Sequence, residues 1–190
     1  ELPANTLSQI KGIQPQPFAA GSFGQVYYGE YIDGTPIIVK VLRPMVRELL
    51  KYDLKLLSIF AKRFYNSLMP NMDFNFTDAV KDFSAATLRE TDYVTEAAFA
   101  HELYAYYKGH PKLVIPQTYL ELCTPNIIVQ QYVGGLSAAQ VIKLMQQGVD
   151  PKLYVFEQIG SDLDEQLETL GYEEMLGIFH LSRIQGDPHP

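Results

Sequence analysis

Aromatic and β-branched residues alternate with polar ones in two neighbouring runs near the start of the chain. The first run is "QVYYGEYI" at residues 25–32, and the second is "TPIIVKVL" at residues 35–42. The dipeptide Asp33-Gly34 separates them, and it favours a tight hairpin turn because glycine readily adopts positive φ. The pattern therefore predicts an antiparallel hairpin. Residues 1–17 contain three prolines among polar residues and predict an irregular lead-in.

A helical period follows the hairpin. Residues 45–69 place polar side chains on one stripe and apolar side chains on another, at spacings of three and four. Pro70 ends this pattern. Because their apolar stripes need a partner, we expect this helix and the next to lie against the lobe that contains the predicted strands, and not to float as a linker. Further helices are predicted at 77–88, 92–107, 137–147, within 150–162 and at 164–184, and further strands at 117–123 and 126–133.

The order of these elements indicates the fold class. Strands are predicted mostly before residue 134 and helices mostly after it, and Gly134-Gly135 breaks the pattern between them. The sequence predicts an α+β protein with a mixed lobe at 1–134 and a helical lobe from 135 to 190. A helical insertion at about 45–89 and a helix at about 92–107 belong to the first lobe.

Composition restricts the classes of function. The chain of 190 residues has a formal net charge of -7, which argues against nucleic acid as a partner. Cys123 is the only cysteine, so no internal disulfide forms and a reducing compartment is expected. No run of about 18 apolar residues predicts a membrane span, and no signal peptide is recognised. No H-x-x-H or H-E-x-x-H pattern supports a zinc site.

Small residues gather in a loop before the first strand. The stretch "AAGSFGQV" at residues 19–26 follows the G-x-G-x-x-G-x-V pattern of protein-kinase phosphate loops at Gly21, Gly24 and Val26, and it has Ala19 at the first position. Small residues allow a backbone to approach a ligand closely. The alternative is a tight turn into an ordinary hairpin.

Lys40 ends the apolar run "IIVK", one hairpin after this loop. A kinase-type lysine at that point reaches nucleotide phosphates, whereas a strand-end lysine without that role is simply solvated. The lysine needs a carboxylate partner, and Glu96 lies among alanines, which suggests a partly buried acid. We therefore predict a direct Lys40–Glu96 ion pair. Asp92 lies four residues before Glu96, so the two acids either hold a cation or form a solvated first helical turn.

The segment "RIQGDPHP" closes the chain and presents Asp187 between Gly186 and Pro188. Two prolines stiffen the segment, and an aspartate held rigidly at a cleft suits a catalytic base or a group that orients a nucleophile. The alternative is an Asp-Pro turn after a helix.

Four segments, taken in order, resemble the UbiB family of atypical kinases, the aarF-domain kinases. They are "FAAGSFGQVYYGEY", "IIVKVLRP", "RETDYVTEAAFAHEL" and "RIQGDPHP". The resemblance covers roughly residues 15–190. It implies a protein-kinase-like two-lobe fold with an antiparallel-sheet N-lobe, inserted helices and a helical C-lobe that is cut at the catalytic loop. The two predicted helices between Lys40 and Glu96 agree with such an insertion.

The resemblance assigns roles to particular residues. Lys40 and Glu96 would position the phosphates, Asp187 would be the catalytic-loop aspartate, and Glu90 and Asp92 would form the family's E-x-D pair. Residues 129–133 would form the hinge that binds adenine. The implied nucleotide-binding residues are Ala19, Ala20, Gly21, Ser22, Phe23, Gly24, Val26, Ile38, Lys40, Gln131, Tyr132 and Val133.

The chain also departs from the family pattern. Gly21 replaces the usual alanine of the loop, Ile38 replaces the alanine above the adenine, and Gln131 replaces the glutamate at the hinge. Residues 11–14 do not match the family's K-x-G-Q motif, which is expected upstream of Glu1.

The function implied is that of an ATP- or ADP-binding, Mg²⁺-dependent atypical kinase or ATPase. It would support isoprenoid-quinone (coenzyme Q-like) biosynthesis or lipid homeostasis, with membrane lipids or quinone-biosynthesis proteins as partners. The location implied is the cytoplasm or an organelle matrix, peripheral at a membrane. Two alternatives stay open: a pseudokinase scaffold for lipid-synthesis enzymes, and a small-molecule kinase of the aminoglycoside or choline type.

Metal binding is not assigned to any residue of the chain. The family's catalytic asparagine and the aspartate of its D-F-G segment are expected beyond Pro190. We therefore expect these 190 residues to bind nucleotide weakly and to transfer no phosphoryl group.

Overall fold

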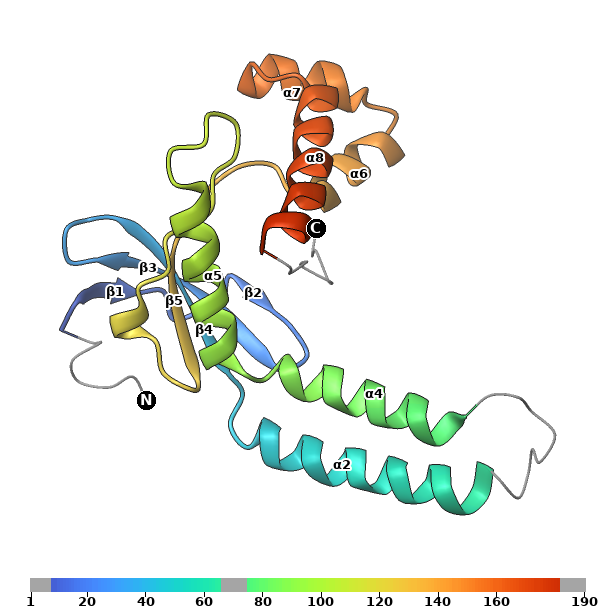
Figure 1. Cartoon of the computed structure of the whole chain (residues 1–190). Helices are drawn as coiled ribbons and strands as arrows, with labels where there is room; N and C mark the ends of the chain where they lie inside the picture. The colour runs from blue at the N-terminus through green and yellow to red at the C-terminus, as the bar shows by residue number, and fades with distance from the viewer. Residues whose placement is uncertain (1–7, 66–74, 182–190) are drawn as a thin grey trace. The chain divides into compact units, whose positions relative to one another are not determined.

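The structure is a computed structural model that describes residues 8–65 and 75–181 (Figure 1). Contacts divide the chain into two compact units. The first comprises Glu1–Tyr106 with Pro116–Tyr132, and the second comprises Tyr107–Ile115 with Val133–Pro190. Within the described residues, no helix is both long and apolar enough to cross a membrane.

An antiparallel sheet forms the centre of the first unit (Figure 1). Its path runs β1-β3-β4-β5, and the short β2 also pairs with β3. The predicted hairpin is confirmed: β3 and β4 pair from Gly24 opposite Leu42 to Glu30 opposite Pro36, and Gly34 takes φ 89° in the turn between them. The strands are β1 (Ile10–Ile13), β2 (Ala19–Ala20), β3 (Gly24–Tyr31), β4 (Pro36–Leu42) and β5 (Ile127–Gln131).

Two predictions about the strands are wrong. The lead-in contains β1, which pairs with the outer side of β3 although its sequence, "IKGI", is too short to show alternation. The segment at 117–123 is not a strand. Only Thr118 makes a β-bridge to Gln130, and the chain then turns into a 3-10 helix, Leu120–Leu122. The turn points the Leu122 side chain into the core, where it is fully buried.

The sheet has an apolar core on each face because side chains of successive strand residues point to opposite sides. Ile37 and Val39 of β4 face one core, and Leu42 faces the other. The helix α5 (Tyr93–Tyr107) contributes Tyr93 and Ala97 to the second core. By the same alternation, Ile38 and Lys40 of β4 lie on the α5 side of the sheet.

The inserted helices pack on each other. The helix α2 (Val46–Phe60) continues into a π-helical turn, Ala61–Tyr65, and runs beside α4 (Phe76–Arg89) as a hairpin that extends away from the sheet (Figure 1). The buried side chains of the hairpin include Leu54 and Val80. The two helices belong to the first unit, and each covers part of the apolar surface of the other.

Arg47 connects the base of this hairpin to the rest of the first unit. Its Nε and Nη2 donate to the Thr91 carbonyl at 3.0 and 2.6 Å, and its Nη1 donates to Asn126 Oδ1 at 2.6 Å. The Pro125 carbonyl accepts a further bond from Nη2. One guanidinium therefore links the first turn of α2, the residues before α5 and the turn before β5.

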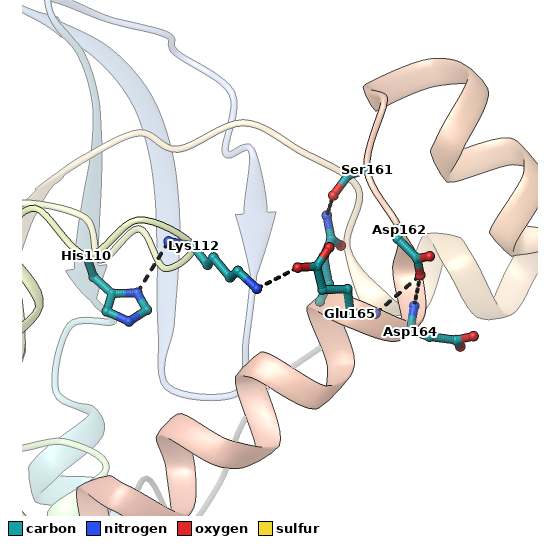
Figure 2. Close-up of polar contacts among 7 residues, drawn as sticks. His110, Lys112, Ser161, Asp162, Asp164 and Glu165 are labelled. Atoms are coloured by element: carbon teal, nitrogen blue, oxygen red, sulfur yellow. Dashed lines mark hydrogen bonds and ion pairs between the residues drawn. The ribbon is translucent and has the colours of Figure 1, made fainter.

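Three helices begin at side-chain caps in the second unit. Ser137 and Gln140 form a capping box, the Asp150 carboxylate accepts from two backbone amides, and the Asp162 carboxylate accepts from the amides of Asp164 and Glu165 (Figure 2). Such caps satisfy amides that lack helical partners. The helices are α6 (Ala138–Gln146), α7 (Pro151–Ile159) and α8 (Leu163–Leu181).

The segment Tyr107–Ile115 is fastened to α8. Lys112 Nζ lies 2.5 Å from Glu165 Oε1, and Figure 2 shows this pair reaching from the segment to the helix. His110 Nε2 lies 3.3 Å from Glu173 Oε1, and the Tyr107 hydroxyl donates to the Glu173 carbonyl at 3.2 Å. These contacts explain why the segment belongs to the second unit.

Candidate active site

The predicted ion pair between Lys40 and Glu96 is present. Lys40 Nζ lies 2.7 Å from Oε1 and 3.0 Å from Oε2 of Glu96, so both carboxylate oxygens accept from the ammonium group. Strand β4 supplies the lysine, and the first turn of α5 supplies the glutamate. The two side chains are 33% and 41% exposed, so the charged groups remain accessible to a ligand.

The loop of small residues lies at the end of the strand that pairs with the lysine strand. Ala19 and Ala20 pair with β3 as β2, and Val26 lies opposite Lys40 in the register of β3 and β4. Residues 19–22 are exposed, whereas Gly24 is buried. The backbone of the loop is therefore available to a ligand next to the Lys40 strand.

Arg43 holds this loop, and the sequence reasoning gave it no role. Its Nη2 donates to the Gly21 carbonyl at 3.2 Å, and its backbone amide donates to the Phe23 carbonyl at 2.8 Å. The signal was visible in the sequence, because Arg43 and Pro44 follow the lysine strand directly. A proline at 44 has no amide hydrogen, so it ends the strand pairing and leaves Arg43 at the loop.

Tyr93 was also missed as a site residue. Lys40 Nζ lies 4.8 Å from the centroid of the Tyr93 ring, which is within the range of a cation–π contact. The tyrosine is 1% exposed and packs in the core beneath the loop with Leu42 and Ile128. Burial, together with the nearby Glu96 charge, raises the pKa of Tyr93 to about 12.

Asp92 and Glu96 have different protein partners. The Asp92 carboxylate accepts from the Thr95 hydroxyl at 2.7 Å and from the Thr95 amide at 3.2 Å, as a helix cap does. The Thr95 side-chain and backbone hydrogen bonds hold the pKa of Asp92 below its usual value. Glu90 is exposed at the end of α4. Within residues 8–65 and 75–181, no three His, Cys, Asp or Glu side chains gather as a metal site would require.

The hinge segment, residues 129–133, comprises the last three residues of β5 and the two residues that follow it. The Gln131 amide donates to the Gln117 carbonyl at 2.8 Å, and the Tyr132 amide donates to the Pro36 carbonyl at 2.9 Å. These two amides are thus already engaged. The Tyr132 ring makes edge contacts with Phe18 and Tyr28. Val133 is 44% exposed and is grouped with the second unit. Asp187 lies outside the described residues.

An antiparallel sheet whose strand lysine pairs with a helix glutamate beside a small-residue loop defines the nucleotide lobe of kinase-like proteins. Comparison with known proteins agrees with this class. The model of the ABC1 atypical kinase-like domain matches residues 1–190, and the chain belongs to that family.

Relatives from distant organisms share this domain. The chain is 30% identical over 138 residues to "Probable protein kinase UbiB" of Azotobacter vinelandii, covering 73% of the chain and 26% of the relative. It is 32% identical over 178 residues to chloroplastic "ACTIVITY OF BC1 COMPLEX KINASE 8" of Arabidopsis thaliana, covering 92% of the chain and 22% of the relative. The chain thus spans about a quarter of the length of these relatives.

A solved structure has a similar fold. It is that of Rv3197 from Mycobacterium tuberculosis in complex with erythromycin, which matches with a TM-score of 0.58 at 26% identity. The match covers 71% of this chain and 33% of that chain. The predicted α+β, kinase-like fold class is therefore confirmed.

Proposed function

We propose that the first unit is the nucleotide lobe of an ATP-dependent atypical kinase or ATPase. The observation that supports it best is the Lys40–Glu96 ion pair next to the loop at residues 19–24. An exposed ion pair contributes at most about 1 kcal/mol to stability. A pair that adds so little to folding, yet joins a strand to a helix across the lobe, is better explained by a role in ligand binding.

Each group in this site has a definite role toward a nucleotide. The Lys40 ammonium would bind phosphate oxygens by charge-assisted hydrogen bonds, and Glu96 would hold it in place when the site is empty. Amides of the exposed loop would approach the phosphates closely because Ala20 and Gly21 carry little or no side chain. Arg43, through its hydrogen bond to the Gly21 carbonyl, would hold the loop close to the phosphates.

Mg²⁺ enters the proposal from the family and not from the described residues. Asp92 is engaged with Thr95, and Glu96 is engaged with Lys40, so neither carboxylate offers a free pair of oxygens. Phosphoryl transfer by kinase-like proteins uses metal ions that neutralise the phosphate charge. We expect the metal ligands in other parts of the full protein.

The biological role that we propose is support of isoprenoid-quinone biosynthesis or lipid homeostasis. Membership of the family and the relatives named UbiB and ACTIVITY OF BC1 COMPLEX KINASE favour it. We place the protein in the cytoplasm or an organelle matrix, peripheral at a membrane, with membrane lipids or quinone-biosynthesis proteins as partners.

A pseudokinase scaffold is the second candidate function. Ile38 lies on the same sheet face as Lys40, and its side chain is larger than the alanine that the family pattern has there. A narrower adenine site would weaken nucleotide binding without removing the fold. Turnover separates the two candidates, because a scaffold binds nucleotide and does not consume it.

Binding and turnover by the full-length protein test this proposal. MgATP and MgADP are titrated calorimetrically into the wild type and into Lys40→Ala, and phosphate release is measured in parallel with Asp187→Asn. We expect binding that Lys40→Ala weakens at least tenfold, and turnover that Asp187→Asn abolishes. Equal binding by the wild type and Lys40→Ala contradicts the nucleotide site. Binding without turnover supports the scaffold.

The outer face of α2 supports the membrane location. Six apolar side chains lie exposed along it at helical spacing: Met45, Leu49, Tyr52, Leu56, Ile59 and Phe60. In a chain with net charge -7, residues 46–65 carry five basic and two acidic side chains. A basic helix with an exposed apolar stripe is typical of binding to an anionic membrane surface.

Lysines extend this surface toward α4. Lys51, Lys55 and Lys81 line a groove of about 340 Å³ between the two helices, above an apolar floor that includes Leu54 and Val80. Positive charge beside an apolar stripe is complementary to lipid phosphates beside acyl chains. We propose that the hairpin rests on an anionic phospholipid surface.

A further inference from the structure

The Tyr93 hydroxyl is the one buried side-chain polar atom of the described residues that has no hydrogen-bond partner. The tyrosine is 1% exposed, so bulk solvent does not reach this group. Buried hydroxyl groups are nearly always paired, because leaving one unpaired is unfavourable. An unpaired hydroxyl at a functional site is therefore a candidate ligand contact.

The hydroxyl lies directly beneath the loop. A Cβ atom built on Gly24 would be 2.5 Å from the Tyr93 hydroxyl and 3.0 Å from the Val41 carbonyl oxygen. Only glycine fits there, so the hydroxyl and the loop backbone are in direct contact. The ring of the same tyrosine carries Lys40 Nζ at 4.8 Å from its centroid. Tyr93 thus contacts both parts of the proposed phosphate site, the loop at Gly24 and the Lys40 ammonium.

The loop is exposed at its first residues and anchored at Gly24, where it meets the hydroxyl. Residues 19–22 are exposed, and β2 pairs only with β3. Beyond that pairing, the Gly21 amide donates to the Gly24 carbonyl, and Arg43 donates to the Gly21 carbonyl from its side chain and to the Phe23 carbonyl from its amide. Gly24 itself pairs with Leu42 of β4. Contact between the hydroxyl and a ligand that enters beside Lys40 would require the exposed residues 19–22 to move outward while Gly24 stays paired in β3.

We propose that the Tyr93 hydroxyl donates a hydrogen bond to a phosphate oxygen when a nucleotide binds between the loop and Lys40. This inference rests on the proposed nucleotide-binding function. It makes Tyr93 a phosphate-binding residue that is unpaired only while the site is empty. The donor is available at neutral pH, because burial raises the pKa of Tyr93 to about 12 and keeps the hydroxyl protonated.

The alternative is that Tyr93 only fills the core. Tyr93→Phe separates the two roles because it keeps the ring, the contact with Lys40 and the packing. Removing an unpaired hydroxyl should leave the melting temperature of the ligand-free protein unchanged or raise it. Removing a phosphate ligand should weaken MgATP and MgADP binding about ten- to a hundredfold, the size of one hydrogen bond to a charged group.

Tyr107→Phe is the matched control. Tyr107 ends the same helix and is 8% exposed, but its hydroxyl donates to the Glu173 carbonyl at 3.2 Å. This variant should lower the melting temperature by a few degrees and leave nucleotide affinity unchanged. Tyr93→Phe should lower nucleotide affinity and not stability, and Tyr107→Phe should lower stability and not affinity. A general packing effect does not produce this opposite pair of responses.

Calorimetric titration and thermal melting of the full-length wild type and both variants decide the question. Weaker nucleotide binding by Tyr93→Phe at an equal or higher melting temperature supports the proposal. Equal affinity of Tyr93→Phe and the wild type overturns it and leaves the proposed function intact. A lower ligand-free melting temperature of Tyr93→Phe also overturns it, because the hydroxyl then has a partner already. No nucleotide binding by the wild type overturns both.

Discussion

Glu96 accepts the Lys40 ammonium with both carboxylate oxygens, at 2.7 and 3.0 Å, across 56 positions of the chain. The two residues join β4 to α5 and lie beside a loop whose backbone is exposed. Another ion pair of the same length, Lys11–Glu30 at 2.7 Å, joins β1 to β3 and lies near no such loop. A comparison of the two pairs therefore separates the effect of an ion pair on stability from its effect on ligand binding.

Glu96→Gln should weaken nucleotide binding more than it weakens the fold. The pair is partly exposed, so its loss should cost about 1 kcal/mol of unfolding free energy or less. The lysine loses its orienting partner, and we expect the Kd for MgATP to rise about tenfold, since one hydrogen bond to a charged group is lost. Urea unfolding and calorimetry of the full-length protein measure the two effects.

Glu30→Gln is the control for that variant. It removes an equally short ion pair that joins β1 to β3 and involves neither β4 nor α5. It should change both quantities little. Similar losses of affinity in Glu96→Gln and Glu30→Gln would show that the charge of the lobe matters and the position of the pair does not.

Two substitutions of Asp92 distinguish a structural role of its carboxylate from a role in ligand binding. Asn is as good a helix cap as Asp, whereas Ala costs about 0.5–2 kcal/mol at such a position. If Asp92 only caps α5, Asp92→Asn keeps both stability and nucleotide-dependent turnover, and Asp92→Ala loses stability. Lost turnover in a stable Asp92→Asn protein would instead indicate that the Asp92 carboxylate acts on the ligand.

Acid unfolding gives an independent measurement on the same residue. The pKa of Asp92 is lowered by the hydrogen bonds from Thr95, so the carboxylate stabilises the fold above its unfolded pKa of about 3.9. This contribution is lost as the pH falls through the lower, folded pKa. The difference in unfolding free energy between the wild type and Asp92→Ala, which lacks the cap, should therefore shrink below about pH 4. A constant difference from pH 7 to pH 2 would contradict the cap.

The parts of the fold that were predictable from the sequence are those with local signals. The β3–β4 hairpin has alternation and an Asp-Gly turn, and the helix boundaries have caps and prolines. The Lys40–Glu96 pair was predictable because a strand-end lysine and an acid among alanines both need a partner. The 3-10 turn at Leu120–Leu122 was not, because "LEL" alternates like a strand and only the buried position of Leu122 decides otherwise.

Tertiary contacts explain what the sequence did not show. Arg47 reads as one member of a polar helical stripe, and nothing local indicates that it reaches Thr91 and Asn126. Tyr93 reads as an ordinary core aromatic, and its missing hydrogen bond appears only when α5 lies beneath the loop. The packing of α2 on α4 was missed because an apolar stripe predicts burial without identifying its partner.

Arg47 should control the attachment of the helical hairpin. Its guanidinium donates to the Thr91 and Pro125 carbonyls and to the Asn126 side chain. Arg47→Ala leaves these acceptors without a charged donor, and we expect a loss of about 2–3 kcal/mol in unfolding free energy. Arg47→Lys keeps the charge but not the fork of donors, so it should recover only part of the loss.

Urea unfolding and limited proteolysis measure this effect. Trypsin should cut Arg47→Ala within residues 51–89 faster than the wild type, because the hairpin is then less firmly attached. Lys81→Ala removes an exposed ion pair with Asp78 in the same hairpin and should change stability by less than about 1 kcal/mol. Equal stability of Arg47→Ala and the wild type would mean that the bonds of Arg47 do not hold the hairpin.

The exposed stripe of α2 should bind anionic phospholipid vesicles. Tyr52 and Leu56 are 68% and 65% exposed, so serine at both positions should leave the fold intact and lower the bound fraction at least severalfold. Lys55→Glu should lower it as well, because each basic residue near an anionic surface is worth about 1 kcal/mol. Co-sedimentation with vesicles rich in phosphatidylserine, with pure phosphatidylcholine vesicles for comparison, measures both changes.

Val114→Ser, at a residue 69% exposed in the second unit, is the matched control and should bind as the wild type does. Binding that is equal for all variants, or equal for both kinds of vesicle, contradicts the proposed surface. A dimer that Tyr52→Ser/Leu56→Ser dissociates, seen by light scattering in the absence of lipid, would contradict it too and would assign the stripe to a second copy of the chain.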